Sequence, residues 1–346
     1  MTDIRTVRDI GEFGLIAALR AALPEAARAS ARLTLAIGDD AAVWRPTDGE
    51  SLVVTTDSLI ERIHFRLDPG WSDWSGLGHK ALAVNLSDLA AMSAVPALAT
   101  VSLGLRGSER VADLVALYEG MGALAARWSC VIAGGDIVAS PDAVGIHVTA
   151  IGETRGGRSL TRAGASPGDI IAVSGTLGAA AAGLAILLSD ADDPRRRASV
   201  ADALLEAHLR PRPRLDLAPI LLDHGASSAM DLSDGLYGDL PKILEASEVD
   251  GRIETEPIPI AAAVRALFPD RWFDLATRGG EDYELLFTVP PERFTDIERD
   301  GRAIGASVTA IGEILARDGS EARLVARGKD GRETVVAGGA FDHFEE

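Results

Sequence analysis

Val148-Thr-Ala-Ile-Gly-Glu153 recurs later in the chain as Val308-Thr-Ala-Ile-Gly-Glu313. Two strand ends can match by chance, but six identical residues favour a chain built from two similar halves. The length of 346 residues agrees, because a chain of this size is too long for one ordinary hydrophobic core. Residues 154–158, which follow the first copy, have the composition of a linker. We therefore predict two domains, over residues 1–154 and 155–346.

Hydrophobic periodicity predicts helices and strands in both halves, so the expected fold class is α/β (α+β) with sheets that need not be parallel. A further apolar run at 226–230 reads as a strand or a buried segment. The expected helices are residues 12–23, 80–92, 111–128, 177–188, 214–222 and 236–247. The expected strands are residues 33–37, 52–56, 98–105, 130–133, 145–152, 169–173 and 283–289.

The charge of the chain limits its partners. A net charge of −18 and a pI near 4.8 argue against nucleic acid, because phosphate backbones need clustered cations. The same charge favours a nucleotide that arrives with magnesium over a free anion. Cys130 is the only cysteine, which excludes a disulfide framework and a thiolate metal site. The first residues lack the charged-then-apolar order of a signal peptide, and no run of about 18 apolar residues occurs elsewhere. We therefore predict no membrane association and a cytoplasmic location.

Carboxylates recur at the ends of short apolar runs. One such aspartate is usually a turn former or a helix cap, but the recurrence of one pattern favours a shared site. Carboxylates beside small residues suit hard cations such as Mg2+, which bridge protein carboxylates to substrate phosphates. We therefore expect a site for several metal ions and phosphate groups. The motifs are Gly38-Asp39-Asp40, Thr55-Thr56-Asp57, Asn85-Leu86-Ser87-Asp88, Gly134-Gly135-Asp136 and Asp231-Leu232-Ser233-Asp234-Gly235.

Taken singly, these motifs have ordinary explanations. The sequence has no GxxxxGK loop, no GxGxxG after a strand and no kinase HRD or DFG triplet. Residues 134–136 alone indicate a tight turn, and Asp231 with Asp234 equally indicates a capped helix start. Residues 279–284, Gly-Gly-Glu-Asp-Tyr-Glu, could form a surface turn, and a lone histidine such as His64 is more often structural. Residues 341–344, Phe-Asp-His-Phe, are too aromatic for an ordinary polar tail.

Taken together and in order, these motifs resemble the thiamine-monophosphate kinase family. The resemblance runs from Gly11-Glu12-Phe13 to Phe344 and covers nearly the whole chain. The ordered set is highly specific, although no single motif is. It comprises IGDDAA at 37–42, TTDSLIERIHF at 55–65, KALAVNLSDLAAM at 80–92, GGD at 134–136, LTRAGASPGD at 160–169, HLRPRPR at 208–214, MDLSDGL at 230–236 and GGEDYELLF at 279–287.

The resemblance implies an enzyme that transfers the γ-phosphate of ATP to thiamine monophosphate, with several Mg2+ ions, and makes thiamine diphosphate. It also implies the fold shared with aminoimidazole ribonucleotide synthetase and selenide, water dikinase. That fold has two α/β domains, active sites at a cleft, and a homodimer in which the N-terminal sheets form a barrel-like core.

The resemblance also assigns roles to individual residues. Magnesium positions match Asp40, Thr55, Thr56, Asp57, Asp88, Asp136, Asp231 and Asp234, with Asp39 ranked below Asp40. Nucleotide contacts match Tyr118, Gly135, Asp136, Arg162 and Ser233, and contacts to thiamine monophosphate match His64, Glu281 and Phe341. The expected catalytic residues are Asp57, Asp88, Asp136 and Arg162.

The implied reaction is a direct in-line transfer. The acceptor is a phosphate oxygen that is largely deprotonated at neutral pH, so catalysis consists mainly of positioning two anions and neutralising their charge. Arg162 suits the ATP phosphates, because its planar fork matches phosphate oxygens. The chain departs from the family pattern at Arg62, Ile137, Ala179 and Ala340; none of these changes removes an expected metal ligand.

Two alternatives stay open on the sequence. One is another ATP-using synthetase of the same superfamily, which should lack the pairing of GGEDYE with FDHF. The other is a non-catalytic nucleotide-binding or regulatory protein, which has little need for so many metal-facing positions.

Overall fold

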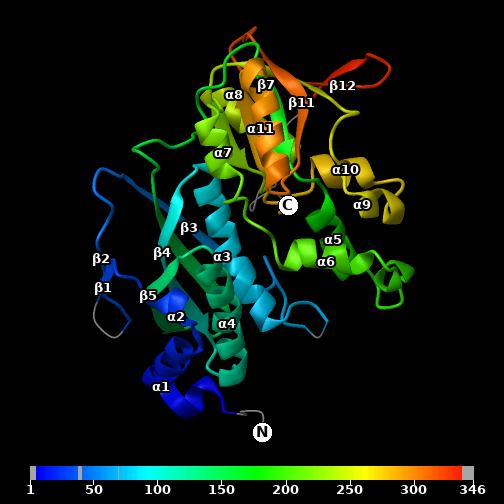
Figure 1. Cartoon of the computed structure of the whole chain (residues 1–346). Coiled ribbons are helices and arrows are strands. Elements are labelled where there is room, and N and C mark those ends of the chain that lie inside the picture. Colours follow the sequence, from blue (N-terminus) through cyan, green and yellow to red (C-terminus); the bar gives the residue numbers. More distant parts are fainter. Residues whose placement is uncertain (1–4, 38–40, 69, 337–346) are drawn as a thin grey trace. The chain divides into compact units, whose positions relative to one another are not determined.

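The structure of the chain is a computed structural model that describes residues 5–37, 41–68 and 70–336. The chain separates into two compact units, each containing helices and a sheet (Figure 1). The predicted two-domain α/β architecture is therefore confirmed. The first unit comprises Met1–Leu89 and Ala94–Gly157, and the second comprises Ala90–Ser93 and Arg158–Glu346. In the described residues, no helix is both long enough and apolar enough to cross a membrane; the cytoplasmic location stays a prediction.

A four-stranded sheet with strand order β3-β6-β4-β5 forms the centre of the first unit. The inner strand β6 pairs antiparallel with β3 and β4, and β4 pairs parallel with β5. Val148 and its partner Val101 are buried, whereas the next pair, Thr149 and Thr100, is half-buried, because successive residues face opposite sides of a sheet. One face of the sheet therefore belongs to the core. The strands are β3 (Leu52–Ile60), β4 (Val95–Leu105), β5 (Val131–Ala139) and β6 (Gly145–Glu153).

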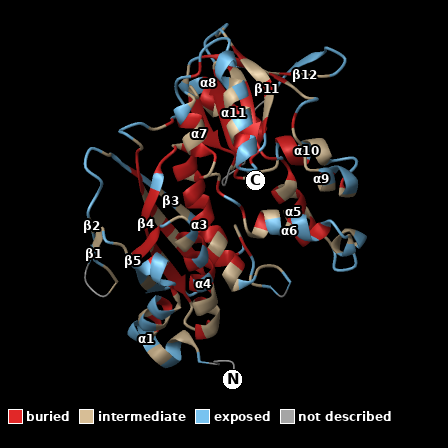
Figure 2. Ribbon diagram, in the orientation of Figure 1, coloured by how far each residue is buried: buried red, intermediate tan, exposed pale blue. Residues whose placement is uncertain are grey.

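Two helices of the first unit approach each other so closely that glycine is required at their contact. A Cβ atom on Gly78 of α3 would lie 1.8 Å from the carbonyl oxygen of Leu117 in α4, and one on Gly120 would lie 1.9 Å from that of Ser75. Helix α3 is buried over most of its length (Figure 2). The remaining elements are α1 (Val7–Ala22), α2 (Glu25–Arg28), α3 (Trp74–Ala91), α4 (Val111–Arg127), β1 (Leu33–Leu35) and β2 (Val43–Trp44).

A seven-stranded sheet with strand order β13-β12-β9-β11-β7-β10-β8 organises the second unit. It is antiparallel except for the parallel pair β12–β9. Ile171 and Val173 of β7 pack in the core cluster that contains the apolar side of α8, and Ala172 between them is buried as well. Both faces of β7 are therefore covered. The strands are β7 (Ile170–Ser174), β8 (Ser228–Asp231), β9 (Asp250–Glu254), β10 (Leu285–Val289), β11 (Val308–Leu315), β12 (Leu324–Arg327) and β13 (Glu333–Val335).

The helices of the second unit pack on this sheet and on one another. Helix α11 contacts β11 and α7 (Figure 1). Helices α5 and α6 meet at Gly183, where a Cβ atom would lie 2.1 Å from the carbonyl oxygen of Leu204. The helices are α5 (Ala179–Leu188), the 3-10 turn η1 (Pro194–Arg197), α6 (Ala201–Leu209), α7 (Ala218–Asp223), α8 (Leu236–Ala246), α9 (Ala262–Leu267), α10 (Trp272–Thr277) and α11 (Pro291–Ala303).

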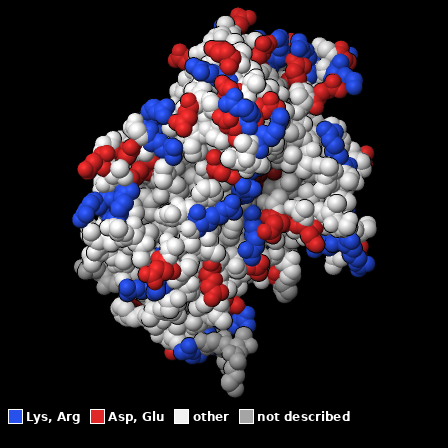
Figure 3. Space-filling model, in the orientation of Figure 1, with Lys and Arg blue, Asp and Glu red and all other residues white. Residues whose placement is uncertain are grey.

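Charged side chains of β9, β11 and β12 in the second unit form cross-strand pairs. Arg252 of β9 pairs with Glu313, its register partner on β11, and Arg327 of β12 pairs with Glu254 on β9. Figure 3 shows basic and acidic side chains intermingled in the upper part of the view. Opposite charges at directly facing positions stabilise a sheet modestly. The net negative charge of the chain is therefore not a uniform field over this surface.

Most predicted elements are present, with ends displaced by a few residues, but two acidic motifs lie elsewhere than expected. The strand predicted over 52–56 continues through Asp57 to Ile60, so the motif at residues 55–57 lies inside β3 and not at the end of a strand. Residues 134–136 likewise lie inside β5 instead of in a turn after it. Polar and small residues interrupt the hydrophobic pattern in both segments, and continuous pairing with β6 and β4 decides their conformation. Tyr283, the first residue of the predicted strand 283–289, lies outside the observed strand, since β10 begins at Leu285.

Candidate active site

Asp57 and Asp88 are brought together in the first unit. Thr55 and Asp57 lie two residues apart on β3 and therefore share a face of the strand. The hydroxyl of Thr55 donates a hydrogen bond to Oδ2 of Asp88 on α3, which shows that this face meets the helix. Burial and the negative charge of Asp88 raise the pKa of Asp57 to about 6. Two carboxyl groups that repel each other at a half-buried position make a site that favours a bound cation.

Asp136 lies apart from this pair. Asp57 stands in register with Val148 and Val101, whose side chains are buried in the core face of the sheet. Asp136 is instead the register partner of Ser102, one residue along from Val101, so it lies on the opposite face. Thr56 also lies on that opposite face, where its hydroxyl donates to the carbonyl of Val148 and accepts from Thr149, each at 3.1 Å. The structure thus divides the expected magnesium positions of this unit between two faces.

The expected ligand contacts of the first unit differ in exposure. Tyr118 is buried in α4 with 6% of its surface exposed, and burial raises the pKa of its phenol. Gly135 is exposed on β5 and has no room for a side chain, because a Cβ atom would lie 2.0 Å from the carbonyl oxygen of Val101. His64 lies in the turn after β3, where Nδ1 accepts the backbone N–H of Ile60 at 3.1 Å. That hydrogen bond places the ring proton of neutral His64 on Nε2.

Two acidic segments of the second unit are tied together by their backbones. The amides of Glu281 and Tyr283 donate to the carbonyls of Ser233 and Leu232, both at 2.9 Å, and the amide of Leu232 donates to the carbonyl of Glu284 at 2.8 Å. Gly280 permits this approach, since a Cβ atom there would lie 2.3 Å from the carbonyl oxygen of Ser233. Residues 231–235 and 279–284, which are distant in sequence, therefore form one local structure.

The backbone of this structure is held in an uncommon conformation. Glu281 has a φ of 68° and Tyr283 a φ of 50°, both in the left-handed region that residues other than glycine seldom occupy. Residues held in this way are often found at functional sites, because the surroundings must compensate for the strain. Glu281, an expected contact to thiamine monophosphate, also has Oε2 within 3.0 Å of Nδ1 of the buried His208 on α6.

Asp234, an expected magnesium ligand, is paired with a lysine. The ammonium of Lys242 donates to Oδ2 of Asp234 at 2.5 Å and to Oδ1 of Asp239 at 2.8 Å. Burial lowers the pKa of Lys242, but the hydrogen bonds to the two carboxylates raise it by more, so the ammonium stays charged. Asp231, the last residue of β8, is buried with 5% of its surface exposed.

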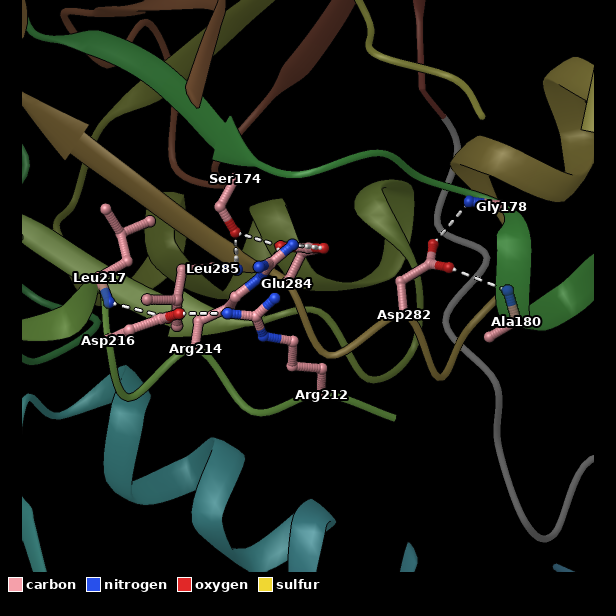
Figure 4. Close-up of polar contacts among 10 residues, drawn as sticks. All are labelled: Ser174, Gly178, Ala180, Arg212, Arg214, Asp216, Leu217, Asp282, Glu284 and Leu285. Atoms are coloured by element: carbon pink, nitrogen blue, oxygen red, sulfur yellow. Dashed lines mark hydrogen bonds and ion pairs between the residues drawn. The ribbon is translucent and has the colours of Figure 1, made fainter. Parts of the chain in front are cut away.

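Two further carboxylates of residues 279–284 are held by the chain itself (Figure 4). Glu284 forms a buried ion pair with Arg214 and also accepts from the hydroxyl of Ser174. Asp282 accepts the backbone N–H of Gly178 at 2.7 Å and of Ala180 at 3.2 Å, at the N-terminal end of α5. Burial nevertheless raises the pKa of Asp282 to about 7, against the lowering by these donors.

Sequence reasoning missed Arg214, Lys242, His208 and Asp282 as individual residues. Arg214 lies in the quoted motif HLRPRPR and Asp282 in GGEDYELLF, so both motifs were noticed, but the sequence did not show which residues these two side chains contact.

Arg162 is exposed, and its carbonyl accepts from the hydroxyl of Ser247 at 3.1 Å. Asp40 and Phe341 lie outside the described residues, as do Asp39 and Ala340. Across the described ranges, no three histidine, cysteine, aspartate or glutamate side chains are grouped as a complete metal site.

Known protein families match most of this chain. Residues 38–154 match the family described as "AIR synthase related protein, N-terminal domain", and residues 166–325 match "AIR synthase related protein, C-terminal domain". A thiamine-monophosphate kinase of Escherichia coli (strain K12) is 38% identical over 342 residues, which cover 96% of this chain and 98% of the relative. The thiamine-monophosphate kinase of Bacillus subtilis is 34% identical over 309 residues, which cover 89% and 93%.

Solved structures agree with these relatives. The crystal structure of thiamine-monophosphate kinase from Stenotrophomonas maltophilia superposes with a TM-score of 0.77 at 36% identity and covers 91% of this chain and 96% of its own. A structure described as "AaThiL complexed with AMPPCP and TMP" superposes with a TM-score of 0.73 at 31% identity, covering 99% of this chain and all of its own (100%). The resemblance predicted from the motifs is therefore confirmed.

Proposed function

Because the chain belongs to the thiamine-monophosphate kinase family, we propose that it transfers the γ-phosphate of ATP to thiamine monophosphate, releasing thiamine diphosphate and ADP. The observation that carries this proposal is the full-length likeness to a protein solved with AMPPCP, an ATP analogue, and TMP. A new P–O–P bond forms at the acceptor phosphate as the bond between the β- and γ-phosphates of ATP breaks. Atoms and charges balance without any further co-reactant.

A magnesium ion fits the pair formed by Asp57 and Asp88. Their carboxyl groups are near enough for the charge of one to raise the pKa of the other, and carboxylate oxygens are the ligands that Mg2+ prefers. When bound, magnesium would neutralise phosphate charge and orient the reacting oxygens. We infer that Thr55 positions Asp88 through its hydroxyl. We propose Asp40, Thr56, Asp136 and Asp231 as further magnesium ligands; Thr56 and Asp136 lie on the other face of the sheet from Asp57.

The other proposed contacts divide by ligand. Tyr118, Gly135, Asp136, Arg162 and Ser233 bind the nucleotide in this proposal, and Gly135 is exposed on β5. His64, Glu281 and Phe341 bind thiamine monophosphate in this proposal, with the ring proton of neutral His64 on Nε2. No general base is required, because the attacking phosphate oxygen is largely deprotonated at neutral pH. Positioning and charge neutralisation are then the main sources of rate acceleration.

We further propose that two chains associate through the four-stranded sheet of the first unit. The face opposite to the core carries large exposed apolar side chains, among them Leu52 with 51% and Val54 with 60% of its surface exposed. Asp136 and Thr56 lie on the same face, so association would cover part of the proposed metal machinery. Analytical ultracentrifugation tests this proposal: a purely monomeric chain at micromolar concentration would contradict it.

One assay separates the proposed function from its alternatives. ADP and thiamine diphosphate are measured with ATP and Mg2+ in the presence of thiamine monophosphate, of free thiamine, or of no acceptor. We expect one ADP per thiamine diphosphate, and essentially no reaction with thiamine, whose alcohol has no assigned base. ADP release without thiamine diphosphate would favour a synthetase of the superfamily. Nucleotide binding without any ADP release would favour a regulatory protein.

A further inference from the structure

Lys242 holds the acidic loop at residues 231–235. Its ammonium contacts Oδ2 of Asp234 at 2.5 Å and Oδ1 of Asp239 at 2.8 Å. The second oxygen of Asp239 accepts the backbone N–H of Asp234 at 2.9 Å. Asp239 has no exposed surface, whereas the side chain of Lys242 is 33% exposed. The chain itself therefore supplies an ammonium group that neutralises part of the negative charge of this loop.

This arrangement does not fit a magnesium ion on Asp234. Magnesium binds a carboxylate oxygen at about 2.0–2.1 Å and requires near-octahedral geometry. An ammonium already 2.5 Å from Oδ2 would then lie within a few ångströms of the metal, and the two cations would repel each other. Displacing Lys242 would in turn weaken its hold on Asp239, which is buried and depends on the lysine for its charge partner.

We propose that Lys242, instead of a magnesium ion, supplies the positive charge at Asp234 and binds an anionic oxygen of the nucleotide phosphates. An ammonium has three N–H donors, and Asp234 and Asp239 take two of them. Partial exposure lets the third reach a ligand. Asp234 is then a positioning residue that aims Lys242, not a metal ligand. This inference rests on the proposed function, which brings a nucleotide to this loop through Ser233.

The first experiment counts metal ions. Mn2+ is titrated by electron paramagnetic resonance into the native chain, Asp234→Asn and Asp88→Asn, each with AMPPCP present. We expect Asp234→Asn to bind as many Mn2+ ions as the native chain, with affinities within about threefold. Asp88→Asn should lose an ion or bind about tenfold more weakly. Loss of an ion in Asp234→Asn, as in Asp88→Asn, would overturn the proposal.

The second experiment measures the phosphate contact. AMPPCP binding is measured by calorimetry for every variant at the same saturating Mg2+ concentration. We expect Lys242→Met to bind AMPPCP about tenfold more weakly than the native chain. Lys242→Gln, which keeps a polar end but no charge, should lose affinity in the same way. The matched control is Lys329→Met, because Lys329 forms a surface ion pair with Glu256 at 2.9 Å and is 83% exposed; its affinity should be unchanged.

The outcomes are separable. Unchanged AMPPCP affinity in a folded Lys242 variant would overturn the proposed contact between Lys242 and the phosphates. The number of Mn2+ ions bound by Asp234→Asn decides separately whether Asp234 is a metal ligand, and that measurement does not depend on the Lys242 variants. Neither measurement needs turnover. If the native chain binds Mn2+ and AMPPCP but makes no thiamine diphosphate, the proposed function fails while the results on Lys242 stand.

Discussion

Two acidic sites, one in each unit, are held in opposite ways. In the first unit, Asp57 and Asp88 raise the local negative charge, and the pKa of Asp57 rises to about 6. In the second unit, Asp234 and Glu284 each have a cation on the carboxylate, Lys242 and Arg214 respectively. Carboxylates therefore form a candidate site for an added cation in one unit and an internal ion pair in the other. Acidic motifs alone do not identify metal ligands.

Removing one charge from the first unit should have the largest effect. We expect Asp88→Asn to reduce kcat by about 100-fold or more, because a weakened cation site loses charge neutralisation between the two phosphates. The fold should be retained, since Asp88 is half-buried and the amide keeps its shape. Steady-state kinetics at saturating Mg2+, with circular dichroism as the control, checks this. A native turnover number in Asp88→Asn would remove Asp88 from the catalytic machinery.

Removing one cation from the second unit should affect stability more than chemistry. The side chains of Arg214 and Glu284 are only 12% and 10% exposed. Arg214→Met leaves Glu284 as a buried uncompensated charge, which costs about 3 kcal/mol of unfolding free energy. The double variant Arg214→Met with Glu284→Gln should recover part of that loss, because it removes the unpaired charge. Urea denaturation measures both, and equal stability of single variant and native chain would contradict the contrast between the units.

The pH dependence of stability should reveal the strain at Asp57. Its pKa is raised from 3.8 to about 6 on folding, so the folded chain binds this proton more tightly than the unfolded chain does. The contribution of Asp57 to stability therefore falls as pH rises from about 4 through 6. Above that range, Mg2+ should restore stability by binding the folded state.

Thermal melts at pH 5 and pH 7.5 test this directly. We expect Mg2+ to raise Tm more at pH 7.5 than at pH 5, and Na+ at matched ionic strength to raise it less. Without metal, Asp57→Asn should melt above the native chain at pH 7.5, because the variant lacks the repelled carboxylate. If the variant melts lower there, the repulsion between Asp57 and Asp88 is not a cost to the native fold.

The smallest effect is expected where a charge pair is exposed. Lys329 and Glu256 are 83% and 58% exposed, so water already solvates both groups. Lys329→Met should change the unfolding free energy by less than about 0.5 kcal/mol. Urea denaturation beside Arg214→Met provides the comparison. A loss as large as that of Arg214→Met would mean that burial does not separate structural ion pairs from incidental ones in this chain.

Some structural features could be predicted from local sequence and others could not. The helix over 111–128 and the strand over 145–152 were predicted closely, because each has clear periodicity. The continuation of the predicted strand 52–56 through Asp57 to Ile60 was missed, since polar residues interrupt the hydrophobic pattern there and only the pairing with β6 extends the strand. The pairing of Arg214 with Glu284 joins residues separated by 70 positions, a distance at which no local pattern reports a contact.

The amino-acid sequence by itself determined the family, the two α/β domains and the acidic motifs, because an ordered set of short motifs is a property of the chain and needs no coordinates. Only the tertiary structure decided that Asp57 faces Asp88, that Asp136 lies on the other face of the sheet, and that Asp234 belongs to Lys242. The physical reason is that the state of a carboxylate depends on burial and on the distance to the next charge. Packing sets both quantities, because it places residues that are far apart in the sequence next to each other.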